Sequence, residues 1–326
     1  MRKRNLLIGA LALGGLMALS PLAAKESPSE GHALSHNPTI QESLAREAGK
    51  KADEKRKQIV QEAVSALKET FAALKALEDG NREKALQSLA NATGKLELVV
   101  ARDPALALAP VDVSLTTYDV LATADDIMAA RKEVLRLLQE GNLPAARELL
   151  DSLRSEVVVN VTSIPLATYP EAIKAVTPLI DEGKLDQAKK ALKSALATLV
   201  VTHHVIPLPL LRADESLVIA EVLAEKQNRS QKENQALSNT LAAVEEQLRL
   251  SEALGYGSHE DYEVLKRQLD EIREKVHGGK SGTGFFDKIK ASLMKLRADI
   301  FGTAAMEETK GNTEKDGTKP ESTTGS

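Results

Sequence analysis

The sequence contains no cysteine, which excludes both disulfide bonds and thiol nucleophiles. It also lacks tryptophan, and only four phenylalanines and four tyrosines occur among its 326 residues. The fold must therefore be stabilised by packing, and the chain is long enough for one substantial core or two small ones. Alanine and leucine are abundant, and both favour helices. The composition predicts an all-α fold.

Motifs of common hydrolases and metalloenzymes are absent as well. The sequence has neither a Gly-x-Ser-x-Gly nor a His-Glu-x-x-His pattern. His203 and His204 are adjacent, and neighbours in an extended segment point to opposite faces, so they are not expected to share a metal ion. Lys280 lies in a Gly-Lys-Ser stretch, but the first glycine of a phosphate-binding loop would fall at Glu274. We therefore expect no catalytic residues, metal or cofactor, although an enzyme with an unrecognised site stays open.

The first residues predict export. Basic residues at positions 2–4 precede an apolar run over residues 6–19 and small residues up to Ala24. This order is typical of a signal peptide, with cleavage expected after Ala24 and an exported mature protein. The run has 14 residues, fewer than the about 20 that span a bilayer, although an uncleaved anchor stays open. Cleavage would remove three cations and change the net charge from −4 to −7, which argues against nucleic acid as a partner.

Three helical hairpins are predicted from a pattern repeated around a glycine. The turns are centred on Gly80, Gly141 and Gly183, and glycine ends a helix readily because it adopts the left-handed conformation at little cost. An alanine stands five residues after each glycine and a leucine nine residues after it. These residues are Ala85, Ala146 and Ala188, with Leu89, Leu150 and Leu192. We expect the alanines to let two helices approach and the leucines to fill the seam between them.

Each hairpin is followed by an apolar segment with a valine pair and prolines. Because proline interrupts helices and biases the preceding residue toward an extended conformation, we interpret these segments as irregular crossovers that converge on one side of the core. An apolar wall with a few polar groups suits a small molecule. The candidate binding residues are Tyr118, Tyr169, Pro165, Leu166, Pro207, Leu208 and Pro209. The alternative is that the two tyrosines only close the core at helix entrances.

Three runs within residues 57–212 are distinctive in combination. They are KLELVVARDPALALAPVDVSLTTYDV, EVVVNVTSIPLATYPEAIKAVTPLIDEGK and ALKSALATLVVTHHVIPLPLLRA. Together they resemble the YfdX family of bacterial exported proteins. The resemblance implies a helical periplasmic domain over about residues 56–212, self-association, and a link to acid and envelope stress. It implies no established reaction and does not cover the residues that follow.

Residues 213–302 are predicted to form a helical extension. Apolar positions recur at helical spacing on both sides of Gly255, which predicts an antiparallel coiled-coil hairpin, and the polar span 227–235 is interpreted as a solvated part of its first helix. A final amphipathic helix over residues 285–301 is expected to dock on this hairpin, although membrane contact stays open. Residues 25–55 are predicted as a flexible leader and residues 303–326 as a disordered tail.

Two functions are consistent with these features. The first is a non-catalytic periplasmic stress protein, chaperone-like, that forms homo-oligomers or binds client proteins. The second is a protein that binds small apolar ligands at the proline-bearing crossovers.

Overall fold

The structure is a computed structural model that describes residues 38–313, including the side chains of residues 40–302. The predicted signal peptide, residues 25–37 of the predicted leader and residues 314–326 of the predicted tail lie outside the described residues.

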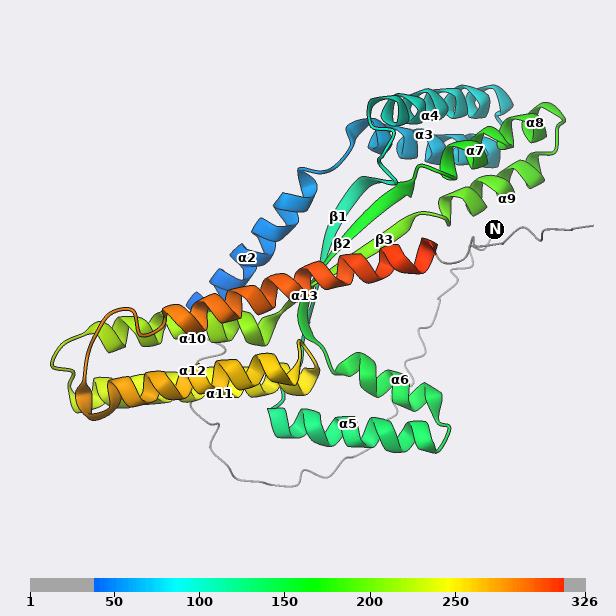
Figure 1. Cartoon of the computed structure of the whole chain (residues 1–326). Helices are drawn as coiled ribbons and strands as arrows, with labels where there is room; N and C mark the ends of the chain where they lie inside the picture. The colour runs from blue at the N-terminus through cyan, green and yellow to red at the C-terminus, as the bar shows by residue number, and fades with distance from the viewer. Residues whose placement is uncertain (1–37, 314–326) are drawn as a thin grey trace, which may run out of the picture.

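A three-stranded antiparallel sheet forms the centre of the molecule (Figure 1). Its strands are β1 (Leu108–Asp119), β2 (Ser155–Pro165) and β3 (Val200–Pro207), with β2 in the middle. The molecule is otherwise mainly helical, so the fold is α+β. The prediction of an all-α fold with irregular crossovers is wrong.

The segments that we interpreted as crossovers are the strands themselves. Alternate valines from 157 to 161 in β2 are buried on one face, which is the two-residue period of a strand, and β-branched side chains favour that conformation. The prolines do not prevent strand formation, because Pro165 and Pro207 are the last residues of their strands. Pro110 lies beside a register shift in the edge strand β1, where a missing N–H is tolerated.

All three predicted hairpins are present, and each turns at its predicted glycine. They are α3 (Gln61–Glu78) with α4 (Arg82–Arg102), α5 (Ala124–Gln139) with α6 (Leu143–Ser152), and α8 (Val176–Asp181) with α9 (Leu185–Leu196); α7 (Tyr169–Lys174) precedes the third. Gly80, Gly141 and Gly183 have φ angles of 74°, 74° and 76°, where a residue with a Cβ would be strained. The alanine five residues after each glycine is buried, as expected.

The helices after β3 form a cluster that we name the C-terminal bundle. They are α10 (Leu208–Glu225), α11 (Gln231–Leu254), α12 (His259–Val276) and α13 (Asp287–Thr313), with a 3₁₀ turn η1 (His277–Gly279) before α13. The predicted turn between α11 and α12 is present, with Gly255 as the left-handed C-cap of α11. Apolar side chains from all four helices share one core.

The polar span 227–235 is not part of one long helix, so that prediction is wrong. The chain turns there, and α10 and α11 pack as a hairpin. Ser230 and Glu233 form a capping box at the start of α11. Arg229 is buried in the turn and donates to the carbonyls of Ala224 and Lys280 at 2.8 and 2.6 Å. The polar residues therefore end one helix and begin the next.

The predicted tail begins too early, because α13 continues to Thr313. Residues 304–308 are alanine, methionine and glutamate, which are strong helix formers. The apolar face of α13 packs on the C-terminal bundle, as expected, and buries Ile289 and Leu293, together with Phe286 just before the helix. Among the helices of residues 38–313, none combines the length and apolar character needed to cross a membrane.

Helix α2 (Pro38–Arg56) covers one face of the sheet, so residues 38–55 are not a flexible leader. Ile40, Leu44, Ala48 and Ala52 stand four residues apart and are buried against the valines of β2. Charged residues dominate the segment and obscure this spacing in the sequence.

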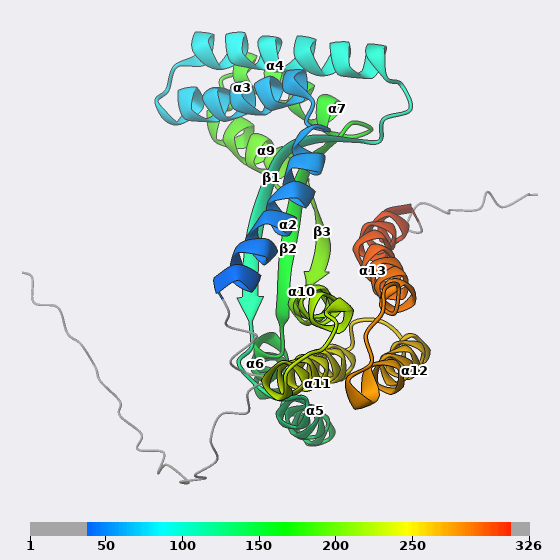
Figure 2. The same ribbon diagram turned by 90° about the vertical axis from the view of Figure 1, so that its left-hand side faces the viewer.

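Helices gather at both ends of the sheet (Figures 1 and 2). At one end α3 and α4 pack against α7, α8 and α9 around one apolar core, which we name the hairpin bundle. At the other end lie the C-terminal bundle and the α5–α6 hairpin. Helix α5 packs on α11 through Ala124, Ile127, Leu250 and Ala253.

A buried polar cluster joins the sheet to the C-terminal bundle. Arg212 of α10 is 4% exposed and donates two hydrogen bonds to Asp119 of β1, at 3.1 and 2.6 Å. Tyr256, in the loop after α11, donates to Glu156 of β2 at 2.8 Å and accepts from the Ser155 backbone N–H at 3.1 Å. Burial and the Glu156 carboxylate raise the pKa of Tyr256 far above its usual value, so its hydroxyl remains a donor.

Candidate functional site

The seven predicted binding residues do not converge, because they lie at two ends of the sheet. In the strand register, Tyr118 and Pro207 both pair with Glu156, whereas Pro165 pairs with Leu108. The strand between Glu156 and Pro165 spans about 30 Å at about 3.3 Å per residue. One small ligand therefore cannot contact both groups. The first group is Tyr118, Pro207, Leu208 and Pro209, and the second is Pro165, Leu166 and Tyr169.

Tyr118 and Tyr169 each end a Leu-x-Thr-Tyr stretch in the sequence, but their surroundings in the structure differ. Tyr169 is the first residue of α7 and is fully buried in the hairpin bundle. Among the described residues, its hydroxyl has no partner in hydrogen-bond geometry. Burial raises the pKa of Tyr169, and the nearby Thr70 hydroxyl partly offsets this rise. Tyr118 instead lies within β1, with the Arg154 guanidinium 3.9 Å from its ring centroid. Tyr169 closes the core, and Tyr118 lies on the sheet.

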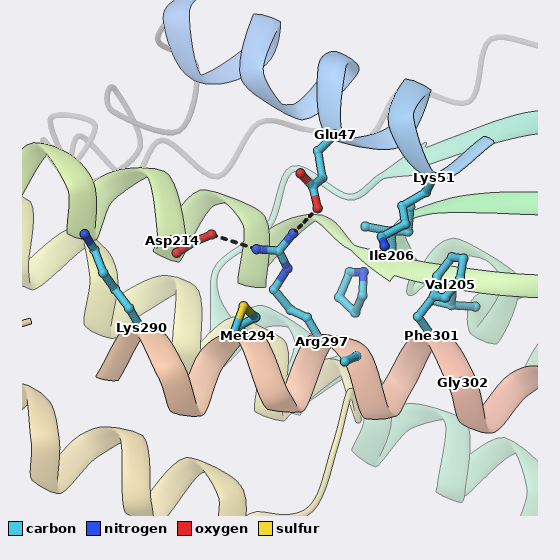
Figure 3. A pocket seen from close by; sticks show the side chains of 12 residues that line it. Glu47, Lys51, Val205, Ile206, Asp214, Lys290, Met294, Arg297, Phe301 and Gly302 are labelled. Carbon is cyan, nitrogen blue, oxygen red and sulfur yellow. Dashed lines mark hydrogen bonds and ion pairs between the residues drawn. The ribbon is translucent and has the colours of Figure 1, made fainter. Parts of the chain in front are cut away.

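A cavity of about 540 Å³ lies between α2, β3, α10 and α13 (Figure 3). Its volume is in the range that holds small molecules. Pro207 is the member of the predicted set that lines it, next to Val205 and Ile206 of the same strand. Met294 and Phe301 of α13 add apolar surface opposite the strand.

Arg297 is the central charged residue of the cavity wall. Its guanidinium donates to Asp214 of α10 and to Glu47 of α2, each at 2.7 Å, as Figure 3 shows. Burial raises the pKa of Asp214, and the charge of Arg297 opposes this rise. Arg297 thus ties α13 to α2 and α10, and its single positive charge is shared between two carboxylates.

The α5–α6 hairpin presents a group of exposed apolar side chains, which we name the α5–α6 apolar surface. It consists of Met128, Leu135, Leu138, Leu143 and Leu150. Leu150 is 49% exposed, whereas its counterparts Leu89 and Leu192 are 2% and 0% exposed. The expectation that Leu150 fills a helix seam is therefore wrong. Its hairpin lies apart from the other two, which pack against each other.

The histidine pair does not form a metal site. His203 contacts the Asn160 side chain at 2.7 Å, whereas the ring of His204 stacks on Phe301 of α13. The two rings thus point to opposite faces, as predicted. Within residues 38–313, no three acidic or histidine side chains gather as metal ligands.

Comparison with known proteins identifies the central part of the chain. Residues 66–205 match the family model described as YfdX protein. Over these residues the chain belongs to the YfdX family. The solved structure of Salmonella Typhi YfdX is similar to this chain at 23% identity and a TM-score of 0.31, covering 46% of this chain and 93% of that chain. The curated proteins contain no match to this chain.

The YfdX region contains most of the sheet and of the three hairpins, but most of the cavity is built from segments outside it. Glu47, Lys51, Asp214 and Arg297 come from α2, α10 and α13, which flank the match on both sides. The flanking helices therefore create the cavity at the β3 edge of the YfdX sheet. No local signal in the sequence marks these residues as a site, because Arg297 is one of several charged residues on the polar face of an amphipathic helix.

His204 is a buried contact between the YfdX sheet and α13. Its Nδ1–H donates to the Phe301 carbonyl at 3.2 Å, and the two ring centroids are 4.9 Å apart. Burial lowers the pKa of His204, and the charges of Lys55 and His203 lower it further, while the Phe301 carbonyl raises it. The unfolded chain therefore takes up a proton at a pH where the folded chain still holds His204 neutral. Neutral His204 therefore adds to the free energy of unfolding above the ordinary histidine pKa of 6.5, and this contribution is lost as the pH falls below that value.

We expect the His204→Gln variant to lose less stability than the wild type between about pH 7 and pH 5, because the variant lacks this titration. Urea unfolding at several pH values measures the free energy of unfolding directly. The control is His203→Gln, which removes the exposed neighbour and should leave most of the wild-type pH dependence in place, because burial is the main cause of the lowered pKa of His204. Equal losses in wild type and His204→Gln would show that His204 is not held neutral in the folded chain.

Proposed function

We propose that this protein is a non-catalytic, exported envelope protein that acts through protein association. In this proposal the contact surface is the α5–α6 apolar surface, and its occupant is a second copy of the chain. The signal-peptide pattern in residues 2–24 supports export. Membership of the YfdX family supports a role in acid and envelope stress.

The difference among the three hairpins carries this proposal. The α3–α4 and α8–α9 hairpins cover each other in the hairpin bundle and so bury Leu89 and Leu192. The α5–α6 hairpin has the same glycine turn and the same buried alanine, yet Leu150 is exposed. In the hairpin bundle, each hairpin with this glycine turn and buried alanine is thus covered by another hairpin. A second copy brings an α5–α6 hairpin that can cover the first in the same way.

The charges beside this surface suit contact between two identical surfaces. Arg136 lies between Glu133 and Glu140 on α5, with a contact of 2.5 Å to each. In a two-fold arrangement each copy can therefore offer opposite charges to the other. The mature chain would carry −7 at neutral pH, so protonation of carboxylates reduces repulsion between copies. Association should strengthen as the pH falls from 7 toward the isoelectric point.

Sedimentation velocity of the mature chain tests the proposal. We expect the wild type to sediment as a dimer or larger assembly, and a variant with Leu135→Glu and Leu138→Glu to sediment as single chains. Both leucines are exposed, so the helix content seen by circular dichroism should not change. Val222→Glu is the matched control, because Val222 is an exposed apolar residue of α10 outside the α5–α6 apolar surface.

Two results would contradict this assignment. Assembly of the double variant to the same mass as the wild type would place the contact elsewhere. A wild type that stays a single chain from pH 7 to pH 5 would exclude a second copy as the occupant. If that single chain still suppressed aggregation of a denatured client, the occupant would be the client.

A further inference from the structure

We propose that the cavity between α2, β3, α10 and α13 binds an amphipathic anion, and specifically a medium-chain carboxylate. The site is separate from the α5–α6 apolar surface and does not depend on the association proposed above.

The apolar part of the cavity suits an alkyl chain. Val205 and Ile206 line one side, and Met294 and Phe301 line the side formed by α13 (Figure 3). The Phe301 ring is held in place by its stacking on His204. Met294 is 68% exposed, so most of this large, flexible apolar side chain in the cavity wall is in contact with water. An unbranched chain would gain by removing this surface from water.

The charged part of the cavity favours an anion. Lys51 and Lys290 are both in the lining, and they pair with Glu54 at 3.1 Å and with Glu221, respectively. An ammonium group has three N–H donors, so each lysine can hold a further oxygen acceptor beside its paired carboxylate. Lys51 Nζ lies 5.5 Å from the centroid of the Phe301 ring. A cation therefore stands at the edge of the apolar wall, where the headgroup of an amphiphile would lie.

The carboxylates of the cavity do not favour a cationic ligand. Glu47 and Asp214 both accept a hydrogen bond from Arg297, so each already has a cationic partner. To bind these carboxylates, a cationic headgroup would have to displace the Arg297 guanidinium, whose nitrogens lie 2.7 Å from an oxygen of each. The lining holds three cations, Lys51, Lys290 and Arg297, against two carboxylates, because the glutamates that pair with the two lysines lie outside it. Charge complementarity thus selects an anionic headgroup over a cationic one.

Titration calorimetry of the mature chain with decanoate tests the proposal, at concentrations below micelle formation. We expect one decanoate per chain, and at least about tenfold weaker binding of decyltrimethylammonium, which has the same chain length and the opposite charge. Lys51→Gln should weaken decanoate binding about tenfold, because it removes a charge-assisted hydrogen bond. Lys132→Gln, an exposed lysine of α5, is the matched control and should bind as the wild type does.

A second variant tests the apolar wall without a change of charge. Met294→Gln should weaken decanoate binding, whereas Met128→Gln on α5 should leave it unchanged. Equal binding of decanoate and decyltrimethylammonium, or wild-type affinity in Lys51→Gln, would overturn the proposal. An absence of both heat and thermal stabilisation by decanoate would overturn it as well. The variant with Leu135→Glu and Leu138→Glu should still bind decanoate, so failure of the association proposal is distinguishable from failure of this one.

Discussion

Asp119→Ala is expected to lower the free energy of unfolding by about 3–5 kcal/mol, because it leaves a buried charge without its partner. Arg212 is almost fully buried at the start of α10, and its two hydrogen bonds to protein carboxylate both go to Asp119. Asp119 also accepts a hydrogen bond from the Ser155 hydroxyl at 3.0 Å. The substitution therefore disrupts the polar cluster that joins the sheet to the C-terminal bundle.

Urea unfolding measures this loss, with Asp125→Ala as the matched control. Asp125 pairs with Arg249 at 2.9 Å, but both side chains are largely exposed. Exposed ion pairs contribute at most about 1 kcal/mol, so the control should change stability little. A loss below about 1 kcal/mol in Asp119→Ala would mean that Arg212 finds solvent or another partner, and the buried pair would not hold the two parts together.

The second large effect is expected at Tyr169. Tyr169→Ala should lower the free energy of unfolding by about 3–5 kcal/mol, because it leaves a cavity in the hairpin bundle in place of a fully buried ring. Tyr169→Phe keeps the ring and removes only the hydroxyl. Among the residues that the structure describes, that hydroxyl has no partner in hydrogen-bond geometry, and the Thr70 hydroxyl donates its own proton to the Ala66 carbonyl at 2.9 Å. The phenylalanine variant should therefore be as stable as the wild type, or slightly more stable.

Thermal and urea unfolding of the two Tyr169 variants separate ring packing from hydrogen bonding. Tyr118→Phe is a useful companion, because Tyr118 lies on the sheet and its ring contact with Arg154 survives the substitution. A loss of 1 kcal/mol or more in Tyr169→Phe would show that its hydroxyl has a structural partner, contrary to the geometry.

The hairpins could be predicted from the sequence because their signals are local. A glycine that adopts a left-handed conformation and a small residue five positions later suffice to define a helical turn. Gly80, Gly141 and Gly183 all behave in this way. The same local rule failed for the leucine four residues further on, because burial of Leu150 depends on what packs against the hairpin.

The sheet is not predicted from the sequence because the valine runs and the prolines beside them indicate different structures. Prolines at 165 and 207 indicate the end of regular structure, and this signal conflicts with the alternation of valines within β2. Both indications are correct, because the valines form the strands and the prolines are the last residues of those strands. A period of two in a run of β-branched residues was the signal that could have identified β2.

The cavity could not be predicted, because its residues are far apart in the sequence. Arg297 contacts Glu47 across 250 positions and Asp214 across 83. Local patterns place each residue on a helix but do not say which helices meet. The family resemblance could not supply this either, since α2, α10 and α13 lie outside residues 66–205.

Site-specific cross-linking tests most directly whether two copies of the chain contact each other through the α5–α6 apolar surface. The chain has no cysteine, so Leu135→Cys introduces a single thiol on α5, and Val222→Cys introduces one on α10 as a control. Each variant is treated with a short bis-maleimide and separated on a denaturing gel. We expect a covalent dimer for Leu135→Cys and single chains for Val222→Cys. Single chains for Leu135→Cys, or equal cross-linking of the two variants, would contradict a contact at this surface.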